Sequence, residues 1–275
     1  MDPLNTLYEQ LNKHLPGLDL RRGEPMARHT TFRVGGPAAL MALPRGEEEL
    51  RAVLALAAQE GVRPFFLGKG SNLLVADEGV DAFLIKLAGG LTRLECRGET
   101  GLYVASGVTL AQAAAFAAEQ GLTGLEFAHG IPGTLGGGVF MNAGAYDGEL
   151  AQVIAWVDCL DLAPGDPQAI RAKMADLAQR RRAKQPLEYP SAGSTFKRPA
   201  GHFAGGLIEQ CGLKGTAVGG AQVSEKHAGF VINTGGATCR DILTLIRLVR
   251  DTVRRETGVE LEPEVRLLGC TLEEP

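Results

Sequence analysis

Hydrophobic and polar positions follow two periods along this chain. Apolar residues recur at spacings of three and four over residues 47–60, 109–120 and 238–257, which predicts amphipathic helices. Further helices are predicted over 167–184 and 203–212. Short apolar or alternating runs predict strands over 64–67, 83–87, 102–105, 153–160, 217–223, 230–233 and 265–268. Because helical and strand segments are mixed throughout, the pattern predicts an α+β protein.

Residues at the ends of these segments support the predicted helices. Thr238 and Asp241 have the spacing of a capping box at the start of the longest helix. Asp166 followed by Pro167 is typical of a helix start, and Gly258 follows the last apolar position of the longest helix. We therefore expect helices over 167–184 and 238–257 to begin and end close to these residues.

Composition narrows the class of protein. The chain has 275 residues, of which 45% are hydrophobic and 22% charged, as in ordinary globular proteins. The formal net charge of -4 argues against nucleic acid as the main partner. No apolar run is long enough to span a membrane, and residues 1–18 lack the apolar core of a signal peptide, so we expect a cytoplasmic protein. Five scattered cysteines without a CxxC pair favour reduced thiols over disulfides or zinc, and we expect no metal site.

Two glycine-rich segments are the candidates for ligand binding. They are GKGSNLLV at 68–75 and GIPGTLGGGVFMNAGAYD at 130–147. Glycine brings no side chain to a core, but it permits sharp turns and close approach of the backbone to a ligand. Backbone N–H groups exposed in this way bind phosphates. Neither segment has the glycine spacing of the Rossmann fingerprint, so we expect a nucleotide-cofactor site of another fold.

Six blocks of sequence resemble, in order, the UDP-N-acetylenolpyruvoylglucosamine reductases usually called MurB. The blocks are His29–Gly36, Leu67–Val75, Gly130–Tyr146, Ala192–Pro199, Ala228–Asn233 and Leu261–Arg266. The resemblance implies two FAD-binding subdomains of the vanillyl-alcohol-oxidase-like type, at 1–88 and 89–197, and a C-terminal α+β substrate domain at 198–275. It also implies FAD as the cofactor, NADPH as the reductant, a UDP-sugar enolpyruvate as the small-molecule substrate, and a monomer.

The same resemblance assigns candidate site residues. Those expected to bind FAD are Gly68, Gly70, Ser71, Asn72, Leu73, Ile131, Pro132, Gly133, Gly136, Gly137, Asn142 and Gly144. Ser194 in the GSTFK motif is expected to donate a proton to the reduced substrate, and Glu264 in PEVR to assist. Lys197 and Arg198 are expected to face the substrate. The run Arg180–Arg182 allows two interpretations, a diphosphate-binding cluster or a solvated helix face. His129 and His227 are expected to be structural.

One part of the family pattern is missing. The family carries a Tyr-Arg pair between the strand after the glycine-rich segment and the helix that precedes the serine, and its arginine is expected to stabilise the enolate. Here Asp161 runs directly into Leu162, with no Tyr-Arg between them. We expect a few tens of residues to be lacking here. Either the natural protein is longer at this point, or the deletion is genuine and weakens catalysis; an intact mass near 29.0 kDa would establish the deletion.

Two alternatives to the reductase remain open from the sequence. Another FAD oxidoreductase of the same fold, acting on a sugar or a hydroxy acid, would keep the glycine-rich segments. It would have no reason to carry both GSTFKRP and LEPEVR. A flavin-binding protein with impaired catalysis would explain the missing arginine.

Overall fold

The computed structural model describes residues 2–156 and 159–273, which form two compact units. Unit 1 comprises Met1–Arg21, Leu40–Lys69 and Ala82–Ala183, and unit 2 comprises Arg22–Ala39, Gly70–Asp81 and Lys184–Pro275. Three of the five unit boundaries fall within strands, namely β1 (Asp19–Pro25), β2 (Pro37–Leu43) and β5 (Val80–Lys86). The three-domain division expected from the sequence stays a prediction.

The first half of unit 1 packs two helices around part of a four-stranded sheet. The sheet has the order β1-β2-β5-β3, with β3 (Pro64–Leu67) parallel to β5. Helices α1 (Pro3–His14) and α2 (Glu47–Gln59) contact each other. Their buried faces share a core with the sheet that includes Leu7, Val53 and Phe83. The helix predicted over 47–60 is thus confirmed, whereas α1 was not predicted.

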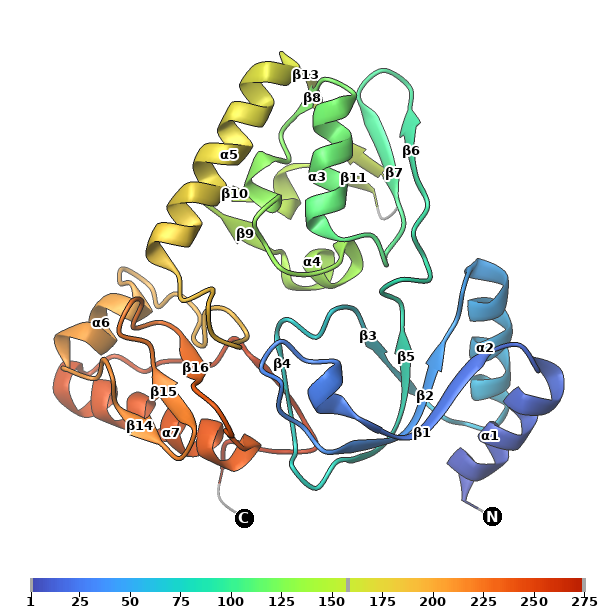
Figure 1. Cartoon of the computed structure of the whole chain (residues 1–275), viewed down its shortest axis with the longest axis horizontal. Helices are drawn as coiled ribbons and strands as arrows, with labels where there is room; N and C mark the ends of the chain where they lie inside the picture. The colour runs from blue at the N-terminus through green and yellow to red at the C-terminus, as the bar shows by residue number, and fades with distance from the viewer. Residues whose placement is uncertain (1, 157–158, 274–275) are drawn as a thin grey trace. The chain divides into compact units, whose positions relative to one another are not determined.

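The second half of unit 1 has a separate core around an alanine-rich helix (Figure 1). Its sheet has the order β11-β12-β7-β6. The helices are α3 (Leu110–Glu119), α4 (Leu135–Met141) and α5 (Pro167–Lys184), with the 3₁₀ turns η2 (Glu126–Ala128) and η3 (Leu150–Gln152). The strands are β6 (Leu94–Arg97), β7 (Gly101–Val104), β8 (Leu122–Thr123), β9 (Gly144–Ala145), β10 (Gly148–Glu149), β11 (Ile154–Trp156), β12 (Cys159–Asp161) and β13 (Ala163–Pro164).

The single strand predicted over 153–160 is wrong. The segment forms two short antiparallel strands, β11 and β12, in which Ile154 pairs with Leu160; residues 157–158 lie outside the described residues. Strand β12 also pairs with β7 along three residues. Alternation of apolar and polar residues indicates strand conformation but does not mark where a chain reverses, so it could not separate one strand from two.

Unit 2 is built on one long amphipathic helix. Helix α7 (Cys239–Thr257) buries Ile242, Leu245, Ile246, Val249 and Val253 in the core of this unit. The Thr238–Asp241 capping box forms at its start, and Gly258 adopts a left-handed conformation at its end, as predicted. The other elements are η1 (Met26–Arg28), β4 (Leu73–Val75), α6 (Ala204–Gln210), β14 (Ala217–Val218), β15 (Ala221–Val223), β16 (Val231–Asn233) and β17 (Arg266–Leu268).

Strands in unit 2 bring distant segments of the chain together. Strand β17 lies parallel to β4, with Arg266 opposite Leu73, so the glycine-rich segment at 68–75 meets the end of the LEPEVR motif. The strand predicted over 217–223 is wrong, because the chain reverses at Gly219–Gly220 and forms the antiparallel pair β14 and β15. Gly219 has a positive φ of 52°, which glycine adopts without strain.

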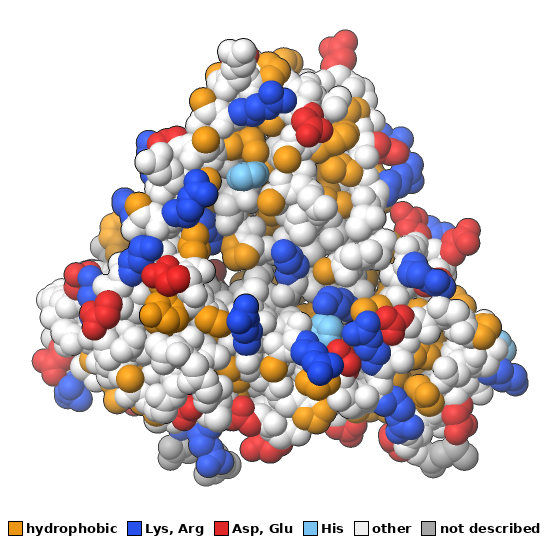
Figure 2. Space-filling model, in the orientation of Figure 1, with side chains coloured by type: hydrophobic (Ala, Val, Ile, Leu, Met, Phe, Trp, Pro, Cys, Tyr) orange, Lys and Arg blue, Asp and Glu red, His pale blue; other side chains and the backbone are white. Residues whose placement is uncertain are grey.

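The surface carries both signs of charge. Figure 2 shows Lys and Arg side chains interspersed with Asp and Glu over the visible face. Among the residues that the structure describes, no helix is long and apolar enough to cross a membrane.

Candidate active site

The GSTFK segment is fixed in unit 2 through its buried central residue, Thr195. The Thr195 N–H donates to the Gly229 carbonyl at 2.8 Å, and the Thr195 hydroxyl accepts from the Val231 N–H at 2.9 Å. The Thr195 carbonyl accepts from the Glu264 N–H at 2.9 Å. Ser194, the residue directly before Thr195, is exposed. The predicted proton donor therefore sits on an anchored backbone with its side chain accessible.

Glu264 links this segment to the first glycine-rich segment. The Asn72 side-chain amide donates to the Glu264 carbonyl at 3.1 Å, and the Arg266 N–H donates to the Asn72 carbonyl at 3.1 Å. Burial raises the pKa of the Glu264 carboxyl, while the positive charge of Lys197 acts in the opposite direction. Unit 2 thus places a predicted cofactor residue, Asn72, directly against a predicted catalytic residue.

The two cations predicted to face the substrate have partners on the protein. The Lys197 ammonium pairs with the Glu262 carboxylate. The Arg198 guanidinium lies over the ring of Phe203, 3.9 Å from its centre. Both line an open cavity of about 450 Å³. These side chains are exposed, so they can exchange these partners for an anionic substrate at little cost.

Gly70 shows why this segment needs glycine. Its φ is +61°, and a Cβ on this residue would collide with the carbonyl of His29. The Gly70 carbonyl accepts from the Thr31 N–H at 3.1 Å. Ser71 and Asn72 are partly exposed, whereas Leu73 is buried at the start of β4. Only part of the predicted set 70–73 can therefore reach a ligand with its side chains.

The second glycine-rich segment, in unit 1, contains a helix that was not predicted. Thr134 is the N-cap of α4. Cβ atoms at Gly136 and Gly138 would approach Ser106 Cβ and Leu150 Cδ1 to within 3.0 Å. These two glycines permit close packing within the protein, which is a role separate from ligand binding. Within the same unit, Gly68 lies against the Thr134 side chain.

Several polar groups of this segment are already used by the protein. The N–H groups of Ile131 and Gly136 donate to the Ala128 and Ser106 carbonyls. The Asn142 side-chain oxygen accepts from the Ala151 N–H at 2.9 Å, and Asn142 itself adopts a left-handed conformation. Gly144 opens the β9–β10 hairpin, where a Cβ would lie 2.8 Å from the Gly148 carbonyl. Pro132 and Gly133 complete the turn before Thr134, where the Gly133 carbonyl accepts from the Leu110 N–H at 3.2 Å.

The two histidines differ. The His227 Nδ1 accepts from the Gly229 N–H at 3.1 Å, and burial lowers the pKa of its imidazole. This is the structural role expected for His227. The His129 Nδ1, in contrast, is buried and has no hydrogen-bond partner among the residues that the structure describes. Buried polar atoms are normally satisfied, so this nitrogen is free to bond a group from outside the chain, such as water or a ligand.

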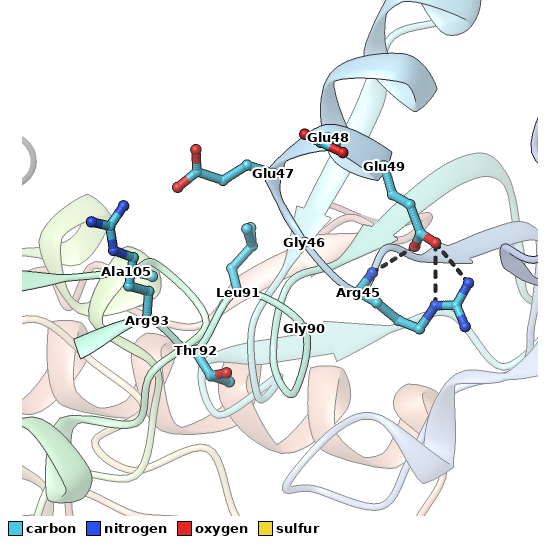
Figure 3. Close-up of a pocket in the computed structure, with 10 residues that line it drawn as sticks. All are labelled: Arg45, Gly46, Glu47, Glu48, Glu49, Gly90, Leu91, Thr92, Arg93 and Ala105. Carbon is cyan, nitrogen blue, oxygen red and sulfur yellow. Dashed lines mark hydrogen bonds and ion pairs between the residues drawn. The ribbon is translucent and has the colours of Figure 1, made fainter.

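A second cavity, of about 500 Å³, is lined by none of the predicted site residues (Figure 3). It surrounds the first turn of α2, where Glu47, Glu48 and Glu49 follow one another. Arg45 pairs with Glu49 at 2.7 Å. The lining carries three glutamates but only two arginines, Arg45 and Arg93. The cavity therefore does not suit an anionic cofactor such as FAD.

Comparison with known proteins identifies the family. Residues 38–170 match the family of FAD binding domains, and residues 185–268 match the C-terminal domain of UDP-N-acetylenolpyruvoylglucosamine reductase. The reductase of Caldanaerobacter subterraneus subsp. tengcongensis is 43% identical to this chain, over 96% of the chain and 98% of the relative. The chain belongs to the UDP-N-acetylenolpyruvoylglucosamine reductase family. This confirms the resemblance that the six blocks indicated, and with it the α+β, FAD-binding fold class.

Other members of this reductase family are similar to the chain in sequence and structure. A reductase of Symbiobacterium thermophilum is 45% identical over 91% of this chain and 92% of the relative. The crystal structure of the reductase (MurB) from Thermus caldophilus superposes with a TM-score of 0.77 at 33% identity, covering 91% of this chain and 99% of that one.

The chain has fewer residues than the number of positions in its alignment with a relative. The alignment with the Caldanaerobacter reductase spans 298 positions, whereas this chain has 275 residues. At least 23 positions, the excess of 298 over 275, therefore have no residue in this chain. Their number is of the size expected from the sequence, a few tens of residues; the position of the missing stretch, between Asp161 and Leu162, stays a prediction.

The residues present fit FAD. The unsatisfied His129 Nδ1 directly precedes the second segment expected to bind the cofactor, and Gly68 of the first segment approaches Thr134 of the second closely. Two residues of the arginine run at 180–182 differ in their surroundings. Arg180 is exposed and pairs with Asp176 at 2.8 Å, whereas Arg181 is buried.

Proposed function

We propose that this chain reduces the enolpyruvyl group of UDP-N-acetylglucosamine enolpyruvate to give UDP-N-acetylmuramate, with NADPH as the reductant. The observation that carries this proposal is the joining of three motifs in unit 2. Asn72 of the glycine-rich segment bonds to Glu264, and Glu264 bonds to Thr195 of the GSTFK segment. An FAD-binding segment is thereby tied to the two residues that we assign to proton delivery.

The reaction adds a hydride and a proton across the carbon–carbon double bond. FAD held by the glycine-rich segments would supply the hydride chemistry at the methylene carbon, with NADPH as the source of the electrons. We assign to the Ser194 hydroxyl the proton transfer to the carboxyl-bearing carbon, where negative charge develops. The hydroxyl is a weak acid, but an enolate is basic enough to take its proton. Burial raises the pKa of the Glu264 carboxyl, and we assign to this group the role of assisting the proton transfer.

The remaining assignments follow the family. FAD is held by the residues predicted at 68–73 and 131–144, and Lys197 and Arg198 bind the charged groups of the substrate. We propose the three parts 1–88, 89–197 and 198–275 as two FAD-binding subdomains and a substrate-binding domain. The protein acts as a cytoplasmic monomer, and its product serves the synthesis of the cell-wall peptidoglycan on which cell shape and division depend.

The test is NADPH oxidation by the purified yellow protein, with and without the enolpyruvyl sugar nucleotide. We expect oxidation that depends on this substrate. Oxidation that ignores it would contradict the proposal and favour another FAD oxidoreductase. A yellow protein without any turnover would support a flavin-binding protein with impaired catalysis, which the 23 or more missing positions favour as a second candidate.

Ser194→Ala tests the assigned proton donor. Rapid mixing separates reduction of the flavin by NADPH from its reoxidation by the substrate. We expect Ser194→Ala to leave the first step unchanged and to slow the second by about 10²–10⁴-fold, the usual contribution of general acid catalysis. Ser191→Ala, three residues before Ser194 in the chain, is the control. It is expected to leave both steps unchanged. Unaltered reoxidation in Ser194→Ala would remove this serine from the mechanism.

A further inference from the structure

Arg181 is a buried cation beside the second glycine-rich segment. It belongs to the last turn of α5 within unit 1, and only 9% of its surface is exposed. Its side chain lies against Gly130, where an added Cβ would fall 3.1 Å from Arg181 Cδ and 3.6 Å from Nη1. In Figure 1, the same helix runs beside β9 and β10, the hairpin that carries Tyr146. The guanidinium therefore lies close to Gly130, the first residue of the glycine-rich segment.

This cation has no carboxylate partner among the residues that the structure describes. Two other cations of α5 show the contrast. Lys173 is near the buried Glu126 carboxylate at 3.7 Å, and Arg180 pairs with Asp176. Burial lowers the pKa of Arg181, and the group that opposes this effect is the Tyr146 phenol. An arginine remains protonated at neutral pH even so, which makes its charge buried and unpaired.

The neighbouring His129 adds an independent observation. Its Nδ1 is buried and has no hydrogen-bond partner within the described part of the chain, and His129 directly precedes Gly130. An unpaired buried charge costs free energy unless an anion compensates it. A buried cation without a carboxylate partner and an unsatisfied imidazole nitrogen thus both lie at Gly130, in a unit whose residues match an FAD binding domain up to 170, and a bound anion would compensate the charge.

We propose that Arg181 binds FAD through a negatively charged group of the cofactor. This inference rests on the proposed function only in that it takes FAD as the bound flavin. Two parts of FAD carry such charge: the diphosphate, and the N1–C2 carbonyl edge of the flavin ring once it is reduced. Arginine suits either, because its planar fork can donate two parallel hydrogen bonds.

The test measures FAD binding to apoprotein through quenching of flavin fluorescence. Arg181→Met is expected to raise the Kd for FAD by about 10–100-fold, the range for loss of a hydrogen bond to a charged group. Arg181→Lys, which keeps the charge but loses the fork, is expected to raise it less, and it replaces Arg181→Met should that variant not fold. Arg180→Met is the matched control, one residue away and exposed, and leaves the Kd unchanged.

Riboflavin and the midpoint potential distinguish the two parts of FAD. A weaker affinity for FAD with an unchanged affinity for riboflavin identifies the diphosphate. A weaker affinity for both, with a more negative potential of the bound flavin in Arg181→Met, identifies the ring edge. An unchanged Kd for FAD overturns the proposal, and a lower affinity for UDP in its place would assign Arg181 to the substrate.

Thermal unfolding of the apoproteins excludes a purely structural role. Because Arg181→Met removes an unpaired buried charge, its apoprotein is expected to unfold at the same or a higher temperature than the wild type. A lower unfolding temperature with an unchanged Kd for FAD would contradict the proposal. FAD binding does not require turnover, so a wild-type protein that binds FAD without oxidising NADPH would fail the proposed function alone.

Discussion

At the scale of single residues, Thr195 anchors the GSTFK segment, a role that the motif by itself does not reveal. Its backbone and hydroxyl bind Gly229, Val231 and Glu264. These contacts hold the neighbouring Ser194 in one place while leaving its side chain exposed. A proton donor needs such a fixed position, because small displacements lower the rate of proton transfer sharply. The sequence offered a signal, a β-branched hydroxyl residue between the serine and an apolar position, but nothing that named its partners.

The carboxyl of Glu264 leads to a prediction about pH and stability. Burial raises its pKa in the folded protein, so the folded state binds this proton more tightly than the unfolded state does. The stabilising effect of that proton is complete below the unfolded pKa and is lost as the pH rises through the folded pKa. Glu264→Gln is therefore expected to be more stable than the wild type above this window and equal to it below about pH 4.

Urea unfolding at a series of pH values measures this difference. Glu260→Gln, an exposed carboxylate on the same stretch of chain, is the control and is expected to show no such crossover. A Glu264→Gln protein that loses stability relative to the wild type at neutral pH would mean that the ionised carboxylate is stabilised by its surroundings, contrary to the effect of burial.

Among the elements, α7 depends on a residue far away in the sequence. The Asp77 carboxylate accepts hydrogen bonds from the Cys239 and Arg240 N–H groups at 2.7 and 3.0 Å. The first N–H groups of a helix have no partner inside the helix, so this carboxylate supplements the Thr238–Asp241 capping box. Both Asp77 and α7 belong to unit 2.

Asp77→Ala is expected to lower the free energy of unfolding by about 1–2 kcal/mol, the usual cost of removing a cap. Chemical denaturation gives this value. Glu78→Ala changes an adjacent exposed carboxylate and is expected to have an effect near zero. Equal losses in the two variants would show that net charge, and not the two hydrogen bonds, matters at this position.

Elements with a strong period and clear ends could be predicted closely. Helix α5 has the predicted bounds, and α7 begins one residue after its predicted start. The hairpins at 153–160 and 217–223 could not be predicted, because a chain reversal inside an alternating run depends on which strand is available to pair. Helix α4 was hidden by its three glycines, which are poor helix formers. Gly138 packs against Leu110 and Leu150, and Gly136 against Ser106.

The candidate site shows the same division. Short motifs located Ser194, Glu264 and the glycine-rich segments, since each carries a residue type suited to one task. The sequence did not distinguish Arg181 from Arg180, because a three-residue run of arginine has no period from which burial could be inferred. Nor did it indicate that the side chain of Asn142 would be occupied by Ala151.

For the whole molecule, the missing stretch is the feature with the largest consequence. We place it between Asp161 and Leu162, where β12 ends and β13 begins at Ala163. Strand β12 pairs with β7, and β13 pairs with β8. Both strands keep their partners although the connection between them is a single residue. An inserted segment would therefore leave and re-enter the fold at neighbouring points.

This geometry predicts that the stretch can be restored without loss of the fold. We expect a chain that carries the corresponding segment of the Caldanaerobacter reductase between Asp161 and Leu162 to unfold at a temperature no lower than the original chain. If that segment brings the arginine that the family uses to stabilise the enolate, substrate-dependent NADPH oxidation should rise by about 10²–10³-fold, the usual worth of one such charge-stabilising group. A glycine–serine insert of equal length controls for chain length and should leave turnover unchanged. If the grafted chain folds and binds FAD but reduces the substrate no faster, the missing stretch does not limit catalysis, and the residues of the present chain must stabilise the enolate themselves.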